Sequence, residues 1–388
     1  MPHSKKAALA EFAPERAALA KAKRIVVKVG TNLLTGGETR VHVGYVRRLA
    51  AAVSALWNDG RQVAIVTSGA IGAGCGVLGF KSRPKLLPER QACAAAGQVE
   101  LMQLYAQAFH RVKPKRAVGQ VLLTRDGLEE RHRYLNARHT LEALFERGAV
   151  PIVNENDTVS VEEIRFGDND TLSALVAAAI EADLLVILTD VAGLCDSPPG
   201  ENPNAKLIDH VPALTPEILA LAKPASSGLG TGGMITKLEA AKIVTGAGEP
   251  LVLAGGHDPE ILLQIVAGRR VGTYFAPRGD RLTARKRWLA FTQRPSGRIK
   301  VDAGARDALV KRHKSLLPSG ITGVDGRFES GDLVELAGPD GAAFARGLTN
   351  FSHAEVEKFQ GKRSAQIAAE RGAPLFEEVV HRDNLVIL

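Results

Sequence analysis

The sequence predicts an α/β protein, in which a mostly parallel open sheet is sandwiched by helices and is followed by a small β-rich domain. Between residues 23 and 276, short runs rich in Val, Ile and Leu alternate with longer helical patterns. From about residue 277, turn signals and short strand-like runs replace that alternation. The 388 residues also exceed what one ordinary hydrophobic core holds, so two domains are expected.

The predicted strands of the first domain are short apolar runs bounded by turn residues. They span 24–29, 62–68, 117–123, 149–154, 183–189 and 250–255. Helices between them are predicted at 42–58, 88–112, 130–147 and 170–181. Alternation of this kind favours parallel strands, and ligands of such sheets collect at the carboxyl ends of the strands.

The domain boundaries follow from the same patterns. Residues 1–22 form an Ala-rich, basic N-terminal extension, expected to be loosely ordered or a short helix without evident chemistry. The first domain is predicted over 23–277, a basic linker over 278–295, and the β-rich domain with the C-terminal tail over 296–388. In that last part, strands are expected at 298–302, 332–337 and 342–350, and a helix at 353–359. The segment EVVHRDNLVIL closes the chain.

The composition argues against several classes of protein. Cys75, Cys93 and Cys195 form no C-x-x-C pair, which argues against a disulfide framework or a zinc site and for reduced thiols in a cytoplasmic protein. No apolar run approaches the ~18 to 20 residues that span a bilayer. Charged residues and a proline also interrupt the stretch that a signal peptide would need unbroken.

The formal net charge is +8 and the pI is about 9.4. Such a charge is typical of proteins that bind nucleic acid, an acidic surface or a polyanion such as ATP. Basic residues cluster between Arg278 and Lys314 with few acids among them. A solvated linker face is the usual explanation of such a run.

The first motif is VVKVGTNLL, in which Lys28 lies within a predicted strand and Gly30, Thr31 and Asn32 follow in a turn. A lysine inside a buried strand is costly unless it meets an anion, and a Gly-Thr turn supplies backbone N–H groups for phosphate oxygens. A lysine that reaches solvent from the end of the strand is the alternative.

The second motif is IVTSGAIGAG at 65–74, where a strand leads through Ser68, Gly69 and Ala70 into an apparent helix. Small residues let a ligand approach the backbone, and a helix N-terminus favours a negative group. The motif matches neither the dinucleotide fingerprint nor the P-loop, and a purely structural tight turn would explain it as well.

Two polar clusters, NEND at 154–157 and GDND at 167–170, follow a strand and precede a helix. Helix capping and turns use the same residue types. However, Asn side chains both donate and accept hydrogen bonds, and Asp binds amino groups or positions lysines. The pair is therefore consistent with a site that binds both a small polar molecule and cations.

The fourth motif is SGLGTGGMITK at 227–237, where a glycine-rich loop precedes Lys237 in an expected helix. Glycine-rich backbone followed by lysine is a common way to bind phosphate. The spacing is wrong for a Walker A sequence, so either a different kinase architecture or a disordered surface loop would fit it.

Taken together and in this order, six segments resemble the signatures of the amino acid kinase family, and within it those of the kinases of free glutamate. They are VVKVGTNLLTGG, VTSGAI, NENDTV, GDNDTLSAL, LTDVAGL and SGLGTGGMITKL. The resemblance extends from about residue 23 to the C-terminus. The C-terminal part resembles a PUA domain, a small barrel best known in RNA-modifying enzymes.

The resemblance implies a role for each matching residue. Lys28 and Lys237 would contact the ATP phosphates and stabilise the transferring phosphoryl group, with Asp168 orienting both lysines. The implied ATP-binding residues are Lys28, Thr189, Asp190, Thr231, Gly232, Gly233, Met234, Ile235, Thr236 and Lys237. The implied glutamate-binding residues are Ser68, Gly69, Asn154, Asp157, Asn169 and Asp170, with Asp170 organising the glutamate side of the site. No residue is expected to be a dedicated metal ligand.

The resemblance also implies the reaction, in which MgATP phosphorylates the side-chain carboxylate of L-glutamate to give L-glutamyl 5-phosphate, the first step of proline biosynthesis. It further implies a homo-oligomer (dimer or tetramer), feedback inhibition by proline, and a complex with glutamate-5-semialdehyde dehydrogenase. The residues support this chemistry independently. A carboxylate with a pKa of ~4.3 is already ionised at neutral pH and needs no general base, and the sequence shows no evident His-centred catalytic set.

Two alternatives remain. The net charge and the PUA-like segment would suit an RNA-binding or RNA-modifying protein, although the basic cluster lacks interleaved aromatic residues for base stacking. A kinase of another small carboxylate or of carbamate would share the two lysines.

Overall fold

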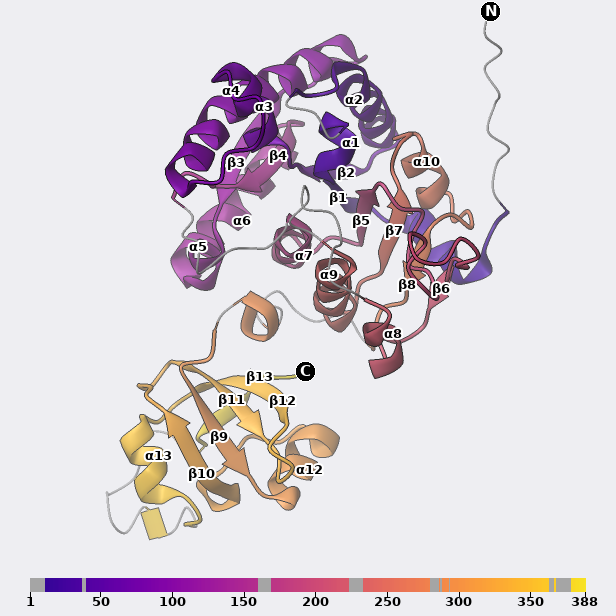
Figure 1. The fold of residues 1–388 in the computed structure, drawn as a ribbon. Coiled ribbons are helices and arrows are strands. Elements are labelled where there is room, and N and C mark those ends of the chain that lie inside the picture. Colours follow the sequence, from indigo (N-terminus) through magenta and orange to yellow (C-terminus); the bar gives the residue numbers. More distant parts are fainter. Residues whose placement is uncertain are drawn as a thin grey trace, which may run out of the picture. The chain divides into compact units, whose positions relative to one another are not determined.

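The computed structural model describes residues 11–36, 40–159, 169–222, 233–279, 286, 288–292, 294–362, 366–367 and 378–388. The chain divides into two compact units, Met1–Arg281 and Leu282–Leu388 (Figure 1). Each unit has its own sheet, and they are described in turn.

The first unit contains an eight-stranded sheet of order β3-β4-β2-β1-β5-β7-β8-β6. The six strands predicted from the sequence are all present, as β1 (Arg24–Val29), β2 (Gln62–Val66), β3 (Val118–Leu123), β4 (Val150–Glu155), β5 (Leu184–Thr189) and β7 (Leu251–Gly255). The short strands β6 (His210–Val211) and β8 (Thr273–Phe275) complete the sheet. Only the β7–β8 pairing is antiparallel among the strand pairs of this sheet in the described residues, which confirms the predicted fold class.

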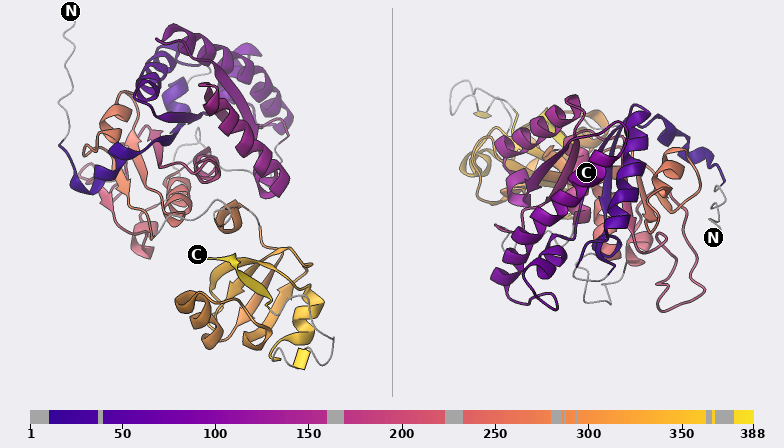
Figure 2. Two further views of the ribbon diagram at one scale, coloured as in Figure 1. Left: turned by 180° about the vertical axis from the view of Figure 1, so that it is seen from behind. Right: turned by 90° about the horizontal axis from the view of Figure 1, so that it is seen from above.

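Helices cover both faces of this sheet (Figures 1 and 2). The apolar face of β1 formed by Ile25, Val27 and Val29 joins a core with α2 (Val43–Asn58), α4 (Leu87–Arg111) and α10 (Ile261–Val266). The opposite face packs against α7 (Asn169–Ala179), which lies beside α9 (Met234–Gly246), while α6 (Arg131–Glu146) covers β3 and β4. Since side chains alternate along a strand, Lys28 points to the α7 side.

Four shorter helices lie in connections between these elements: α1 (Thr31–Thr35), α3 (Ala70–Val77), α5 (Arg125–Glu129) and α8 (Pro216–Ala220). Gly69 precedes α3 with φ of 93°, a conformation that side chains rarely adopt. A Cβ on Gly74 or Gly97 would overlap the backbone of the neighbouring helix, so these two glycines let α3 and α4 touch. Gly74 and Gly97 therefore allow the close packing of α3 against α4.

The described part of the N-terminal extension is held against the first unit. It forms a 3-10 helix, η1 (Pro14–Lys21). Of the two forms expected for the extension, the described part therefore adopts the short helix. Arg16 is fully buried, and its guanidinium donates hydrogen bonds to the backbone carbonyls of Asp209, Arg269, Val271 and Gly272. These acceptors offset the cost of burying the charge, an interaction with no local signal in the sequence.

The second unit contains a five-stranded sheet of order β10-β9-β11-β12-β13. Its strands are β9 (Gly297–Val301), β10 (Ile321–Gly326), β11 (Leu333–Ala337), β12 (Ala343–Thr349) and β13 (Val380–Ile387). Its other elements are α12 (Ala303–Arg312), α13 (His353–Phe359), η3 (Trp288–Thr292) and η4 (Pro318–Gly320). The predicted strands and the helix at 353–359 are confirmed, whereas β10 and α12 were not predicted.

Four residues of the basic cluster, all in the second unit, form ion pairs with acids. Ion pairs join Arg298 to Glu335, Lys300 to Asp325, Arg306 to Asp340 and Lys311 to Asp307. These pairs reduce the positive potential that the sequence alone indicates. In the part of the chain that the structure describes, no helix is long and apolar enough to cross a membrane.

Candidate active site

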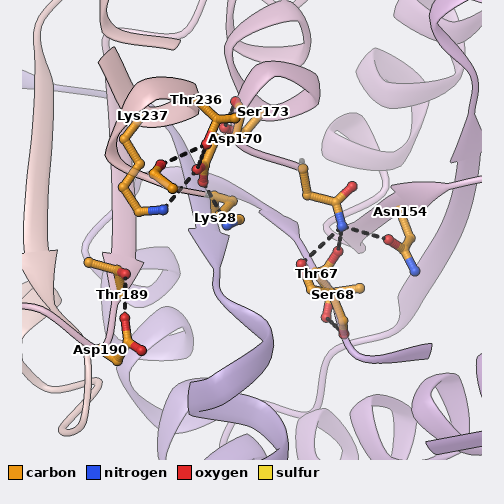
Figure 3. Close-up of polar contacts among 12 residues, drawn as sticks. Lys28, Thr67, Ser68, Asn154, Asp170, Ser173, Thr189, Asp190, Thr236 and Lys237 are labelled. Carbon is orange, nitrogen blue, oxygen red and sulfur yellow. Dashed lines mark hydrogen bonds and ion pairs between the residues drawn. The ribbon is translucent and has the colours of Figure 1, made fainter. Parts of the chain in front are cut away.

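The candidate site side chains gather at the carboxyl ends of β1, β2, β4 and β5, where α7 and α9 begin (Figure 3). Because parallel strands end at the same edge of a sheet, residues far apart in sequence meet there. Figure 3 shows Lys28, Thr236 and Lys237 around Asp170, with Thr67, Ser68 and Asn154 in a separate group.

Asp170 lies between the two predicted catalytic lysines. Its Oδ1 is 2.6 Å from Lys28 Nζ, and its Oδ2 is 3.0 Å from Lys237 Nζ. Thr236 Oγ1 donates a hydrogen bond to the same Oδ2 at 3.0 Å. The carboxylate is fully buried and both lysine side chains are less than 10% exposed. Two ammonium groups share this one carboxylate, and a further anion next to the lysines would be favoured by their charge.

This position of Asp170 differs from the sequence prediction, which put Asp170 on the glutamate side and gave the orientation of the lysines to Asp168. Asp168 lies outside the described residues. Consecutive residues of a helix point about 100° apart, so Asn169 and Asp170 at the start of α7 face different groups. The sequence could not tell the two aspartates of GDND apart without the position where the helix begins.

A second group lies at the end of β5. Thr189 Oγ1 donates to Asp190 Oδ1 at 3.0 Å, and Asn32 Nδ2 donates to Asp190 Oδ2 at 2.7 Å. Burial by itself would raise the pKa of Asp190. The two hydrogen bonds and the charge of Lys237 outweigh burial, so the pKa lies below its ordinary value and the carboxylate stays ionised. Asn32 was not among the predicted site residues, although it stands in the same motif as Lys28.

The loop predicted to cover the nucleotide is described only in part. Thr231 and Gly232 lie outside the described residues. Gly233 is the N-cap of α9, and Met234, Ile235 and Thr236 form its first turn ahead of Lys237. The backbone N–H groups of such a turn have no partner within the helix and favour a negatively charged group.

The third group contains three of the six residues predicted to bind glutamate. Asn169 Nδ2 lies 2.8 Å from the Thr67 carbonyl oxygen, 2.9 Å from Ser68 Oγ and 3.0 Å from Asn154 Oδ1. Asn154 Nδ2 in turn donates to Gln98 Oε1 at 2.9 Å. The structure therefore brings Ser68, Asn154 and Asn169 together, as predicted, and adds Thr67 and Gln98. Gln98 lies inside a long helix, where no motif marks it.

Asp157 follows β4 and Gly69 precedes α3. Burial raises the pKa of Asp157, while the charges of Arg83 and Arg90 act in the opposite direction. A buried carboxylate with a raised pKa gains from a cationic partner, which an amino group would supply.

No group of three or more His, Cys, Asp or Glu residues that could hold a metal ion occurs within the described segments.

Comparisons with known proteins identify the family of this chain. Residues 23–255 match the model of the amino acid kinase family, and residues 297–370 match that of the PUA domain. A glutamate 5-kinase of Geobacter metallireducens is 50% identical over 372 residues, which is 96% of this chain and 99% of that protein. A glutamate 5-kinase of Moorella thermoacetica is 48% identical over 373 residues, which is 96% of this chain and 98% of that protein. A solved carbamate kinase of Giardia lamblia bound to AMP-PNP aligns with a TM-score of 0.48 at 18% identity, over 67% of this chain and 100% of that chain.

The chain therefore belongs to the amino acid kinase family, with a PUA domain after the kinase domain. Within that family its end-to-end similarity is to proteins named glutamate 5-kinase.

Proposed function

We propose that this protein transfers the γ-phosphoryl group of ATP to the side-chain carboxylate of free L-glutamate. The product is L-glutamyl 5-phosphate, and the reaction is the first step of proline biosynthesis. The observation that carries the proposal is the start of α7, where Asp170 holds two buried lysines and the preceding Asn169 belongs to a cluster of amides. The proposed phosphate site, at Asp170, thus lies next to the proposed amino acid site, at Asn169.

The chemistry requires alignment and charge neutralisation more than proton transfer. The glutamate carboxylate, with a pKa of ~4.3, is already the nucleophile at neutral pH. Lys28 and Lys237 neutralise charge that develops on the phosphoryl oxygens, and a fixed geometry makes this effective. Asp170 forms ion pairs with both ammonium groups and accepts hydrogen bonds from Lys237 and Thr236, so its role is to orient the lysines. We assign it this role in place of Asp168.

The site divides between the two substrates. The ATP side consists of Thr189, Asp190 and the α9 N-terminus from Gly233, with Lys28 and Lys237 at the phosphates. The glutamate side consists of Ser68, Gly69, Asn154, Asp157 and Asn169, with Asp157 and Asn169 facing the α-amino group. ATP enters as its Mg²⁺ complex, and the metal neutralises phosphate charge. The family resemblance supports this division, and the three groups of side chains in the site are compatible with it.

Further properties rest on the resemblance alone. We infer a cytoplasmic homo-oligomer, dimer or tetramer, that is inhibited by proline and passes its acyl phosphate to glutamate-5-semialdehyde dehydrogenase. The lability of acyl phosphates favours such a direct transfer. For the PUA domain, the ion pairs of its basic residues argue against a broad RNA-binding surface.

A single assay tests the proposed reaction. The purified protein is incubated with MgATP and hydroxylamine, which traps acyl phosphates as hydroxamates, and with glutamate, aspartate or N-acetylglutamate. Carbamate is tested by ADP release. Glutamate should give by far the highest kcat/KM. Preference for another acceptor would refute the substrate, and absence of turnover with all of them would refute kinase activity on small carboxylates.

A further inference from the structure

Two amide atoms in the glutamate-side cluster make no hydrogen bond to any described residue. They are Gln98 Nε2 and Asn169 Oδ1, both of which are buried. Gln98 itself is only 8% exposed. An unsatisfied buried polar atom is costly, and native proteins nearly always satisfy such atoms. A bound ligand that completes both would remove this cost.

Backbone groups fix the orientation of the Gln98 and Asn169 amides, because a backbone N–H can only donate a hydrogen bond and a backbone carbonyl can only accept one. The Glu155 N–H donates to Asn154 Oδ1 at 2.9 Å, so Asn154 turns its Nδ2 toward Gln98. Gln98 must accept there through Oε1, which leaves its Nε2 as a donor. The Thr67 carbonyl accepts from Asn169 Nδ2, which leaves Asn169 Oδ1 as an acceptor. The cluster therefore offers a donor and an acceptor on two side chains that Asn154 connects.

Gln98 is held firmly in this place by its neighbours on α4. Gly97 lies directly against the backbone of Ala70 at the start of α3, and a larger residue could not be accommodated. Two turns further along the same face, the Tyr105 hydroxyl lies 3.0 Å from Thr67 Oγ1. Contacts on both sides of Gln98 thus anchor α4 to the turn after β2, so the Gln98 side chain cannot move away with its helix.

A donor and an acceptor within one cluster are the complement of the carboxylate and ammonium that an α-amino acid carries on one carbon. We propose that Gln98 is a specificity-determining residue, whose Nε2 donates a hydrogen bond to the α-carboxylate of the substrate while Asn169 Oδ1 accepts from its α-ammonium. The inference rests on the proposed function, because the phosphorylated carboxylate must lie beside Lys28 and Lys237. The α-carboxylate then belongs at the other group of side chains.

The test is Gln98→Glu, compared with Gln103→Glu, a matched charge change at an exposed position of the same helix. The introduced carboxylate can still accept from Asn154, so a purely structural role is preserved. It presents an oxygen instead of a donor to the substrate and repels its α-carboxylate. We expect the glutamate KM to rise roughly 10- to 100-fold, as for loss of a hydrogen bond to a charged group, with the MgATP KM within about twofold of wild type.

A change in the substrate provides the second measurement. Glutamic acid α-amide carries a neutral carboxamide in place of the α-carboxylate, and its NH₂ group can donate to the introduced carboxylate. Wild type should prefer glutamate over this amide, and Gln98→Glu should reduce or reverse that preference, whereas Gln103→Glu should leave it unchanged. Structural disturbance alone would not reverse selectivity between two substrates that differ at one group.

The outcomes separate this inference from the proposed function. If wild type turns over glutamate but Gln98→Glu keeps both the KM and the preference over the amide, Gln98 is not a carboxylate ligand. If wild type does not phosphorylate glutamate, the proposed function fails and the inference fails with it. Should Gln98→Glu not fold, Gln98→Leu decides, because it lacks the donor without adding charge. It should raise the glutamate KM about tenfold and weaken the preference, and an unchanged preference overturns the inference.

Discussion

Replacement of Asp170 by asparagine would test the centre of the site most directly. The change keeps the size of the side chain but removes the charge that lies 2.6 Å from Lys28 Nζ and 3.0 Å from Lys237 Nζ. Two buried ammonium groups would then lose the carboxylate that they share. Removing one partner of a buried ion pair costs about 3–5 kcal/mol, and here one carboxylate serves two partners.

That cost predicts a large thermal shift. At roughly 2–4 °C per kcal/mol for a domain of this size, the Tm of the kinase domain should fall by about 6–20 °C. MgATP should restore more stability to Asp170→Asn than to wild type, because the phosphates provide the missing negative charge. Turnover should still fall by roughly 10² or more even with both substrates saturating, because the lysines lose their orientation.

The assays are thermal unfolding with and without MgATP, and steady-state kinetics. Asp258→Asn is the control, since it removes a carboxylate from an exposed position of the same domain and should change stability by less than about 0.5 kcal/mol. A Tm of Asp170→Asn within the range of this control, together with normal turnover, would refute the assignment of Asp170 as the residue that holds the two lysines.

Three other substitutions test separate parts of the structure. Lys28→Ala or Lys237→Ala should each lower kcat by roughly 10² to 10³ or more through lost charge stabilisation of the transition state, and near-normal turnover in both would contradict their role. Asp157→Ala should raise the glutamate KM and leave the MgATP KM unchanged. Burial raises the pKa of Asp157 above the ~3.9 of an ordinary aspartate, so Asp157 should lose its charge at a pH where an ordinary aspartate is still ionised. The wild-type glutamate KM should therefore increase as the pH falls through that range. The Asp157→Ala variant should not show this pH dependence. Arg16→Met should lower stability by about 2–5 kcal/mol, because its loss leaves one buried and three partly buried carbonyls without their donor, while kcat stays unchanged. Lys21→Met, an exposed cation of the same short helix, should alter neither quantity, and equal effects of the two changes would contradict the anchoring role of Arg16.

The strands could be predicted because each depends on a local pattern that burial on both faces imposes. RIVVKV and LLVILT carry apolar residues at nearly every position, and the structure buries them between layers of helices. Lys28 could be singled out for the same reason, since one charge within such a run must meet a compensating group. By contrast, ITGVDG of β10 has few apolar residues, and pairing with β9 determines its extended form.

The residues that could not be predicted owe their roles to contacts between distant segments. Arg16 belongs to a stretch that reads as a polar extension, and its acceptors lie 193 to 256 residues further along the chain. Gln98 is one of several polar residues on a long helix, and only its contact with Asn154 brings it to the site. No periodicity or motif within either segment carries that information.

The amino acid sequence by itself therefore determined the fold class, the positions of the two lysines and the polar clusters that follow the strands. These features reflect local rules, in which apolar periodicity specifies strands and helices, and glycine and asparagine mark the turns between them. Only the tertiary structure decided which aspartate of GDND lies between Lys28 and Lys237, because that depends on where α7 begins and how it faces β1 and α9. The charge balance of the site is a property of three segments that meet in space, and no single segment contains it.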